Sequence, residues 1–221
     1  MSRVVVVGAR GRTGLLVVKG LLKAGHAVVA TIRNPKHMAE LVKLGAETHV
    51  LDLDSSPLAD FEHAFRGADA VVFAAGSAES DPRSDIDRKG VQRTVRAAMK
   101  AKATRYIAIS ALGATTKLPD GEDWPGMKAY YAAKKTANKV VRNASLFWTI
   151  IEPGTLTEGK ATGKVALSEG KDDVPHKKIS RADVAAVVLA VLDEPKTAGH
   201  TFQIVGGSTT IAQAIKAALK S

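Results

Sequence analysis

The stretch Val4-Val5-Val6-Val7-Gly8-Ala9-Arg10-Gly11-Arg12-Thr13-Gly14 decides the fold of this 221-residue chain. Four successive valines predict a buried strand, and the apolar pattern of residues 15–22 predicts a helix directly after the turn. A strand, a glycine-rich turn and a helix in this order form a phosphate-binding unit. Gly8 would allow the tight turn, Gly11 the approach of a phosphate, and Gly14 the close packing of helix on strand. The alternative is an ordinary strand-to-helix turn, because the spacing is G-x-x-G-x-x-G rather than G-x-G-x-x-G.

Strand and helix patterns alternate along most of the chain. Expected strands cover Arg3–Val7, Ala27–Ile32, Thr48–Leu51, Ala70–Ala74, Arg105–Ser110, Phe147–Ile151 and Thr201–Val205. Expected helices cover 13–24, 35–44, 58–65, 86–102, 126–143, 184–192 and a last segment that ends near Leu219. This alternation predicts an α/β fold, a Rossmann-like doubly wound parallel sheet with helices on both faces.

The segment after residue 152 is less regular. Residues 153–179 are expected to form loops, with a small hairpin around residues 164–167. The sequence Ser180-Arg181-Ala182-Asp183 has the pattern of a capping box before the next helix. We expect residues 1–221 to form a single domain in which residues 153–221 contribute the wall of the substrate site.

The composition narrows the possible classes of function. Hydrophobic residues make up 45% of the chain and charged residues 24%, as in ordinary globular proteins. The sequence has no cysteine, which excludes disulfides and thiolate chemistry and, with no signal-peptide pattern, leads us to expect a cytoplasmic location. No apolar run approaches the roughly 20 residues that span a bilayer. The six histidines show no metal-binding spacing, so no metal site is expected.

The chain carries a net charge of +10, but its basic residues are scattered and its aromatic content is only 5%. Nucleic-acid-binding surfaces usually concentrate their basic residues, so a nucleic-acid partner is not expected. The charge instead favours a phosphorylated cofactor or an acidic small molecule. The sequence leaves the assembly open between a monomer and a homodimer.

The type of cofactor depends on Arg33, which ends the second expected strand about 20 residues after Gly14. A protein that binds NAD places an acid at this point for the ribose 2′-hydroxyl, whereas an arginine accommodates a 2′-phosphate. Arg33 therefore favours NADP (NADPH), and Arg12 adds a second positive charge near the phosphates. The alternative is a solvated arginine at a strand end.

Other candidate cofactor contacts lie at the carboxyl ends of strands, where ligands bind in open α/β sheets. They are Asp52 and Leu53 after the third expected strand, and Ala74, Ala75 and Gly76 after the fourth. The small residues would let ribose and nicotinamide approach. The alternatives are tight packing of the Ala-Ala-Gly run and capping of the turn at residues 55–57 by Asp52.

Several of these segments together resemble the atypical short-chain dehydrogenases/reductases. Residues 8–14, with Thr13 in place, resemble their Gly-Ala-Thr-Gly-x-Thr-Gly turn, and residues 179–185 resemble their Ser-Arg-x-Asp-Val-Ala segment. The chain is most similar to the NAD(P)-binding subgroup that includes NmrA-like proteins and biliverdin reductase B, a flavin reductase. The resemblance implies cofactor contacts from Pro153 and Gly154. Arg10 replaces the usual threonine of the turn, which leaves its role open.

The catalytic candidates are Ser110, at the end of the fifth expected strand, and Tyr130 and Lys134, on the helix 126–143. Helical periodicity places Tyr130 and Lys134 toward the sheet, and Tyr131 and Lys135 toward water. The family's Tyr-x-x-x-Lys pair also falls on Tyr130 and Lys134. A neighbouring ammonium lowers the pKa of a tyrosine from about 10, and a serine can bind a carbonyl oxygen. The alternatives are a packing tyrosine, a solvated lysine and a satisfied hydroxyl.

Three further residues have weaker patterns. Trp124, with Pro125, would either cover the nicotinamide or anchor the start of a helix, whereas His176 is expected to be merely exposed. Asp183 is expected to cap its helix.

These observations predict an NADPH-dependent oxidoreductase that transfers hydride to a small acceptor, namely a flavin, a quinone or a carbonyl compound. One alternative is an NADP(H)-binding sensor without turnover, in which Lys134 would hold only the ribose hydroxyls. A nucleotide-sugar epimerase or dehydratase is less favoured, because residues 153–221 form a short segment for so large a substrate.

Overall fold

The fold is built on a nine-stranded sheet in a computed structural model that describes residues 1–76, 86–115, 127–170, 174–175 and 177–220. The sheet has the order β11-β8-β10-β6-β5-β4-β1-β2-β3. Its parallel strands are β1 (Arg3–Val7), β2 (Ala27–Ile32), β3 (Glu47–Val50), β4 (Ala70–Phe73), β5 (Arg105–Ile109), β6 (Phe147–Pro153) and β10 (His200–Gly206). The antiparallel strands β8 (Lys164–Glu169) and β11 (Thr209–Thr210) complete one edge.

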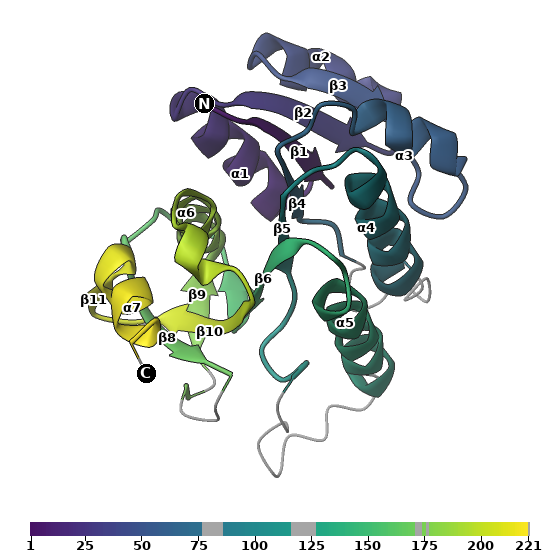
Figure 1. The fold of residues 1–221 in the computed structure, drawn as a ribbon. Helices are drawn as coiled ribbons and strands as arrows, with labels where there is room; N and C mark the ends of the chain where they lie inside the picture. The colour runs from purple at the N-terminus through teal and green to yellow at the C-terminus, as the bar shows by residue number, and fades with distance from the viewer. Residues whose placement is uncertain (77–85, 116–126, 171–173, 176, 221) are drawn as a thin grey trace.

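Helices cover both faces of this sheet. Figure 1 shows α1 (Arg12–Lys23) and α6 (Arg181–Asp193) on one face, and α3 (Leu58–Ala64), α4 (Val91–Lys100) and α5 (Met127–Arg142) on the other. Near the two edges, α2 (Met38–Lys43), after a 3₁₀ turn at Pro35–His37, packs beside β3, and α7 (Ile211–Ala218) packs on β8. The predicted Rossmann-like fold is therefore confirmed, with a mostly parallel sheet.

The valine run of β1 is continuous because the strand is buried on both faces. Val4 and Val6 belong to the core under α1 and α6, whereas Val5 and Val7 belong to the core under α3, α4 and α5. All four side chains are at most 1% exposed. Burial of each valine contributes about 1.5–3 kcal/mol before entropy is counted, so β1 anchors the turn that follows it.

The segment after β6 differs from its prediction. The hairpin expected around residues 164–167 is wrong: this segment forms β8, which pairs antiparallel with β10, Ser168 opposite Gln203. Residues expected to be loop form a second, two-stranded parallel sheet from β7 (Thr155–Thr157) and β9 (Lys178–Ser180). The β8–β10 and β7–β9 pairings each join segments that are distant in the sequence, so no local periodic pattern predicts which strands pair.

Two helix starts also differ from their predicted bounds. The helix expected from residue 86 begins as a π-helical turn, Ile86–Gly90, before α4. The helix expected from residue 184 begins at Arg181, and its N-cap Ser180 accepts a hydrogen bond from the backbone N–H of Asp183 at 2.9 Å. Trp124, Pro125 and His176 lie outside the described residues.

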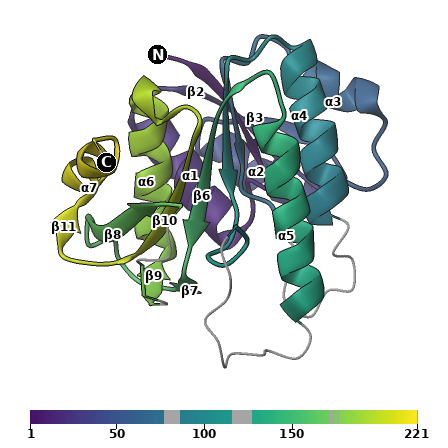
Figure 2. The same ribbon diagram turned by 60° about the horizontal axis from the view of Figure 1, so that its bottom comes forward.

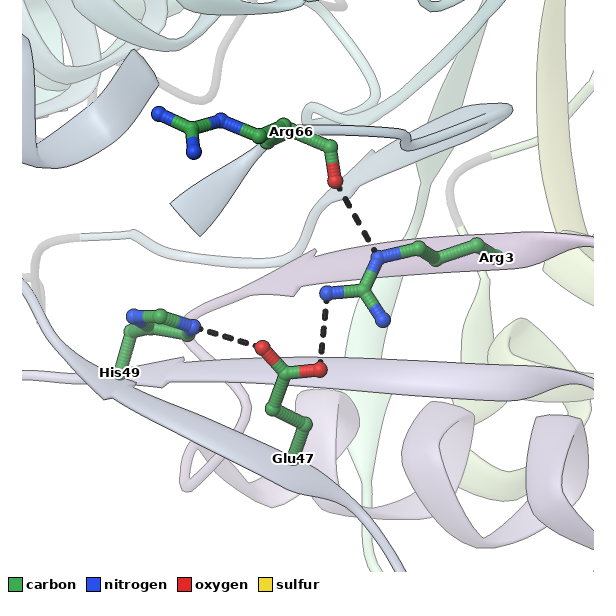
Figure 3. A network of polar contacts seen from close by, with 4 residues as sticks. All are labelled: Arg3, Glu47, His49 and Arg66. Atoms are coloured by element: carbon green, nitrogen blue, oxygen red, sulfur yellow. Dashed lines mark hydrogen bonds and ion pairs between the residues drawn. The ribbon is translucent and has the colours of Figure 1, made fainter. Parts of the chain in front are cut away.

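The starts of the strands are held by a charged network, which Figure 3 shows. Arg3 donates hydrogen bonds to Glu47 at 2.8 Å and to the carbonyl oxygen of Arg66 at 3.3 Å, and His49 contacts Glu47 at 2.9 Å. Hydrogen bonding from His49, and then the contact with Arg3, lower the pKa of Glu47. This network lies where the parallel strands β1 and β3 begin, at the end of the sheet opposite to the carboxyl ends of the strands.

No helix in the described ranges is long and apolar enough for a membrane crossing.

Candidate functional site

A cleft of about 1120 Å³ opens at the carboxyl ends of the strands, where the fold predicts a ligand. The predicted site residues that line it are Gly8, Arg10, Gly11, Arg12, Thr13, Arg33, Asp52, Leu53, Ala74, Ala75, Gly76, Ser110, Tyr130, Lys134, Pro153 and Gly154. Gly14 does not line it. The structure thus brings nearly all of the candidates to one cavity, although they come from seven separate segments of the chain.

The glycine turn is packed so tightly that larger residues would not fit. Gly8 has a φ of +77°, and a Cβ there would lie 2.8 Å from the backbone of Ala75. A Cβ on Gly14 would lie 2.2 Å from the carbonyl oxygen of Gly8. Gly14 therefore acts in the packing of α1 on the turn, which explains why it does not line the cleft.

The start of α1 is suited to an anion. Its N-cap is Gly11, which supplies no side-chain hydrogen bond, and its first turn contains no acidic residue. The first N–H groups of a helix lack partners within the helix, and the helix dipole makes this end positive. With the surrounding small residues, this donor set fits the diphosphate of a dinucleotide.

The end of the cleft beside β2 is rich in hydrogen-bond donors. Arg33, Asn34 and His37 line it together with Arg10, whose Nε lies 2.8 Å from Glu40 on α2. Asp52 is the only acid among the described residues that line the cleft. Its Oδ1 accepts a hydrogen bond from the backbone N–H of Asp54 at 2.9 Å, a local turn contact that lies before the turn at residues 55–57.

The opposite end of the cleft contains a buried ion pair. Lys134 Nζ lies 2.9 Å from Asp87 Oδ1, and the two side chains are 6% and 1% exposed. Burial lowers the pKa of Lys134, but the charge of Asp87, the adjacent Tyr130 and the hydrogen bond from Lys134 to Asp87 outweigh burial and raise it overall. Lys134 is therefore held as an ammonium ion at neutral pH.

Tyr130 and Ser110 border this ion pair. The ring centroid of Tyr130 lies 5.7 Å from Lys134 Nζ. The hydroxyl of Ser110 is buried and has no hydrogen-bond partner within the described part of the chain. A buried, unsatisfied hydroxyl costs free energy, so Ser110 is available to a ligand group that reaches the cleft floor.

Sequence reasoning missed three residues of the site. Asp87 belongs to the π-helical turn Ile86–Gly90, a geometry that recurs at functional sites but has no sequence signature. Arg181, the first residue of α6, also lines the cleft. Tyr131, expected to face water, lines the cleft beside Tyr130, because the first turns of α5 extend past the strand ends (Figure 2). Lys135 is exposed, as expected.

Comparisons with known proteins agree with this geometry. Residues 8–195 match the model of the NAD(P)H-binding family. A Bacillus subtilis protein, the uncharacterized sugar epimerase YhfK, is 35% identical over 97% of this chain and 99% of its own. A provisionally named NAD-dependent epimerase/dehydratase from Bacillus halodurans is 34% identical with a TM-score of 0.88, covering 98% of this chain and 100% of that one. The oxidoreductase ylbE from Lactococcus lactis is 25% identical with a TM-score of 0.83, covering 99% and 97%.

These matches confirm the resemblance on which the sequence interpretation relied. The family model spans the glycine turn, the ends of the strands and α5, which are the segments that line the cleft. They also confirm the expected class of cofactor, a nicotinamide dinucleotide. The chain belongs to the NAD(P)H-binding family, among the atypical short-chain dehydrogenases/reductases.

Proposed function

We propose that this chain is an NADPH-dependent oxidoreductase that transfers hydride to a small acceptor. The observation that carries the proposal is that one continuous cleft has the glycine turn at one end and the Ser110–Tyr130–Lys134 cluster at the other. The preference for NADPH is supported by Arg33 and Arg10, which line the end of the cleft where a ribose 2′-phosphate belongs.

Lys134 and Ser110 would have separate roles in this reaction. A bound nicotinamide dinucleotide would supply the hydride. Lys134, fixed as an ammonium ion by Asp87, would donate hydrogen bonds to ribose hydroxyls. Ser110 would donate its hydroxyl proton in a hydrogen bond to an acceptor oxygen that gains negative charge.

The buried ion pair favours acceptors that need no proton from tyrosine. An unpaired ammonium beside Tyr130 would stabilise a phenolate, but Asp87 offsets that charge at 2.9 Å. The site is therefore better suited to a flavin or a quinone, because either accepts hydride directly from a stacked nicotinamide. It is less suited to a carbonyl compound whose reduction depends on tyrosine as a general acid.

The test is the loss of absorbance at 340 nm when the protein meets NADPH and a panel of FMN, quinones and dicarbonyls. We expect turnover with FMN or a quinone, and we expect Tyr130→Phe to keep most of it. A dicarbonyl activity that disappears in Tyr130→Phe would instead establish tyrosine acid catalysis. Tight NADPH binding with no consumption would overturn the proposal in favour of a cofactor sensor.

A second candidate, a nucleotide-sugar epimerase, is favoured by the name of the relative that is 35% identical to this chain. An epimerase returns the hydride to its substrate, so it would interconvert sugar nucleotides without net consumption of cofactor. Chromatography of nucleotide sugars incubated with the protein and a catalytic amount of NAD or NADP separates this candidate from the first.

A further inference from the structure

A carboxylate bridges two arginines of the cleft. Arg12, the first residue of α1, and Arg181, the first residue of α6, both donate a hydrogen bond from Nη1 to Oε1 of Glu158, at 3.1 and 2.8 Å. Glu158 follows β7 and belongs to the segment that carries the small second sheet. Both arginines line the cleft, whereas Glu158 is not among its lining residues. One carboxylate oxygen of Glu158 thus lies between two guanidinium groups near the start of α1.

The three side chains differ greatly in exposure. Arg12 is 72% exposed and Glu158 67%, but Arg181 is only 10% exposed. Glu158 is mostly exposed, so water can solvate its carboxylate when it turns away from the arginines. Arg181 cannot follow it, and a buried guanidinium without an anionic partner is strongly unfavourable. If Glu158 leaves, the position between the arginines requires another anion.

We propose that Arg12 and Arg181 form a binding site for a phosphate or diphosphate anion, and that Glu158 is a displaceable carboxylate that holds this site in the free protein. A dinucleotide diphosphate at the start of α1 carries more charge than one carboxylate and is matched by the forked guanidinium donors. The proposal rests on the binding of a nicotinamide dinucleotide, but not on the preference for NADPH or on turnover.

Glu158 and the cofactor therefore compete for the same arginines. Glu158→Gln removes the competing charge and should strengthen binding of NADPH and NADH alike, by about 2–5-fold. Arg181→Gln should weaken the binding of both dinucleotides by a common factor of about 10–100. Substitution of Arg33 should instead change the ratio between NADPH and NADH, which separates the two sites.

The experiment is a titration of each variant with NADPH, NADH and inorganic diphosphate, followed by tryptophan fluorescence. The matched control is Glu47→Gln, which also removes a carboxylate paired with an arginine at 2.8 Å, but at the opposite edge of the sheet. We expect no change in affinity for this control. If thermal unfolding shows that Arg181→Gln does not fold, Arg181→Lys replaces it, because lysine keeps the positive charge but lacks the two parallel N–H donors of the guanidinium group.

The outcomes distinguish the source of the anion. Tighter dinucleotide binding by Glu158→Gln and weaker binding by the Arg181 variants would assign the site to the cofactor diphosphate. Unchanged dinucleotide affinity with altered affinity for inorganic diphosphate would assign it to a phosphate group on the acceptor. Unchanged affinity for all three ligands in both variants would overturn the proposal. A wild-type protein that binds neither dinucleotide would instead overturn the proposed function.

Discussion

Replacement of Gly14 by alanine tests whether the packing of α1 on the glycine turn sets the anion site. A Cβ at this position would lie 2.2 Å from the carbonyl oxygen of Gly8 and 3.0 Å from its carbonyl carbon. Both are backbone atoms, so the start of α1 must move by about 1 Å to restore van der Waals contact. Overpacking of this kind costs about 3 kcal/mol, and the helix propensity of alanine offsets at most about 1 kcal/mol. We therefore expect a net loss of about 2 kcal/mol in the free energy of unfolding.

The same displacement should affect binding, because it moves the first N–H groups of α1 away from the anion. We expect the dissociation constant for NADPH to rise by about 10–100-fold, since a misplacement of 1 Å at a site can have this effect. Urea unfolding measures the stability, and a fluorescence titration measures the affinity. In thermal unfolding, the loss corresponds to a decrease in Tm of about 4–8 °C for a chain of this length.

The matched control is Gly20→Ala on the same helix. A Cβ at position 20 would lie 2.9 Å from Leu189 Cδ2, which is the end of a flexible side chain rather than backbone. We expect a change in stability of at most about 1 kcal/mol and unchanged NADPH affinity. The reasoning is refuted if Gly14→Ala keeps wild-type stability and affinity, or if Gly20→Ala is equally damaging.

Three further substitutions have outcomes that follow from single contacts. Asp87→Asn leaves the Lys134 ammonium buried without its carboxylate and should lower the free energy of unfolding by about 3 kcal/mol in urea titrations. Arg105→Met removes buried hydrogen bonds to two threonine hydroxyls and two carbonyl groups and should cost about 2–4 kcal/mol by the same measurement. Burial raises the pKa of Glu152, so the folded protein holds this proton more tightly than the unfolded chain. Protonated Glu152 therefore stabilises the fold fully below the ordinary glutamate pKa, and this stabilisation is lost as the pH rises through the pKa of Glu152 in the folded protein. Glu152→Gln should flatten that part of the curve of unfolding free energy against pH.

The parts of the fold that the sequence predicts well are those whose signal is local. β1 and β2 have their predicted bounds, because buried β-branched runs bounded by turn residues specify a strand without reference to the rest of the chain. The glycine turn has a local signal in Gly14, which packs against the carbonyl group of Gly8, whereas Gly8 packs against the distant backbone of Ala75. The candidate residues at strand ends follow from these elements, because parallel strands bring their carboxyl ends to one edge.

The parts that could not be predicted depend on distant partners. β8 pairs with β10, and β7 with β9, but β7, β8 and β9 are only partly buried, so their sequences lack a periodic pattern. Asp87 precedes Lys134 by 47 residues, and only the π-helical turn brings the two side chains together. Tyr131 faces the cleft because α5 extends beyond the sheet, which helical periodicity alone cannot show.

The ion pairs of the cleft differ in how easily a ligand can separate their charges. They join Arg10 to Glu40, Arg12 and Arg181 to Glu158, and Lys134 to Asp87. The Arg10–Glu40 and Arg12–Glu158 pairs are at least 40% exposed on both sides, so they contribute little to stability and can exchange their carboxylates for phosphates. The lysine pair is almost fully buried, and separation of its charges would leave both without solvent. In the function that we propose, the phosphate end of the cleft is therefore adjustable and sets the affinity for the cofactor, whereas the end beside Tyr130 is fixed and sets the chemistry.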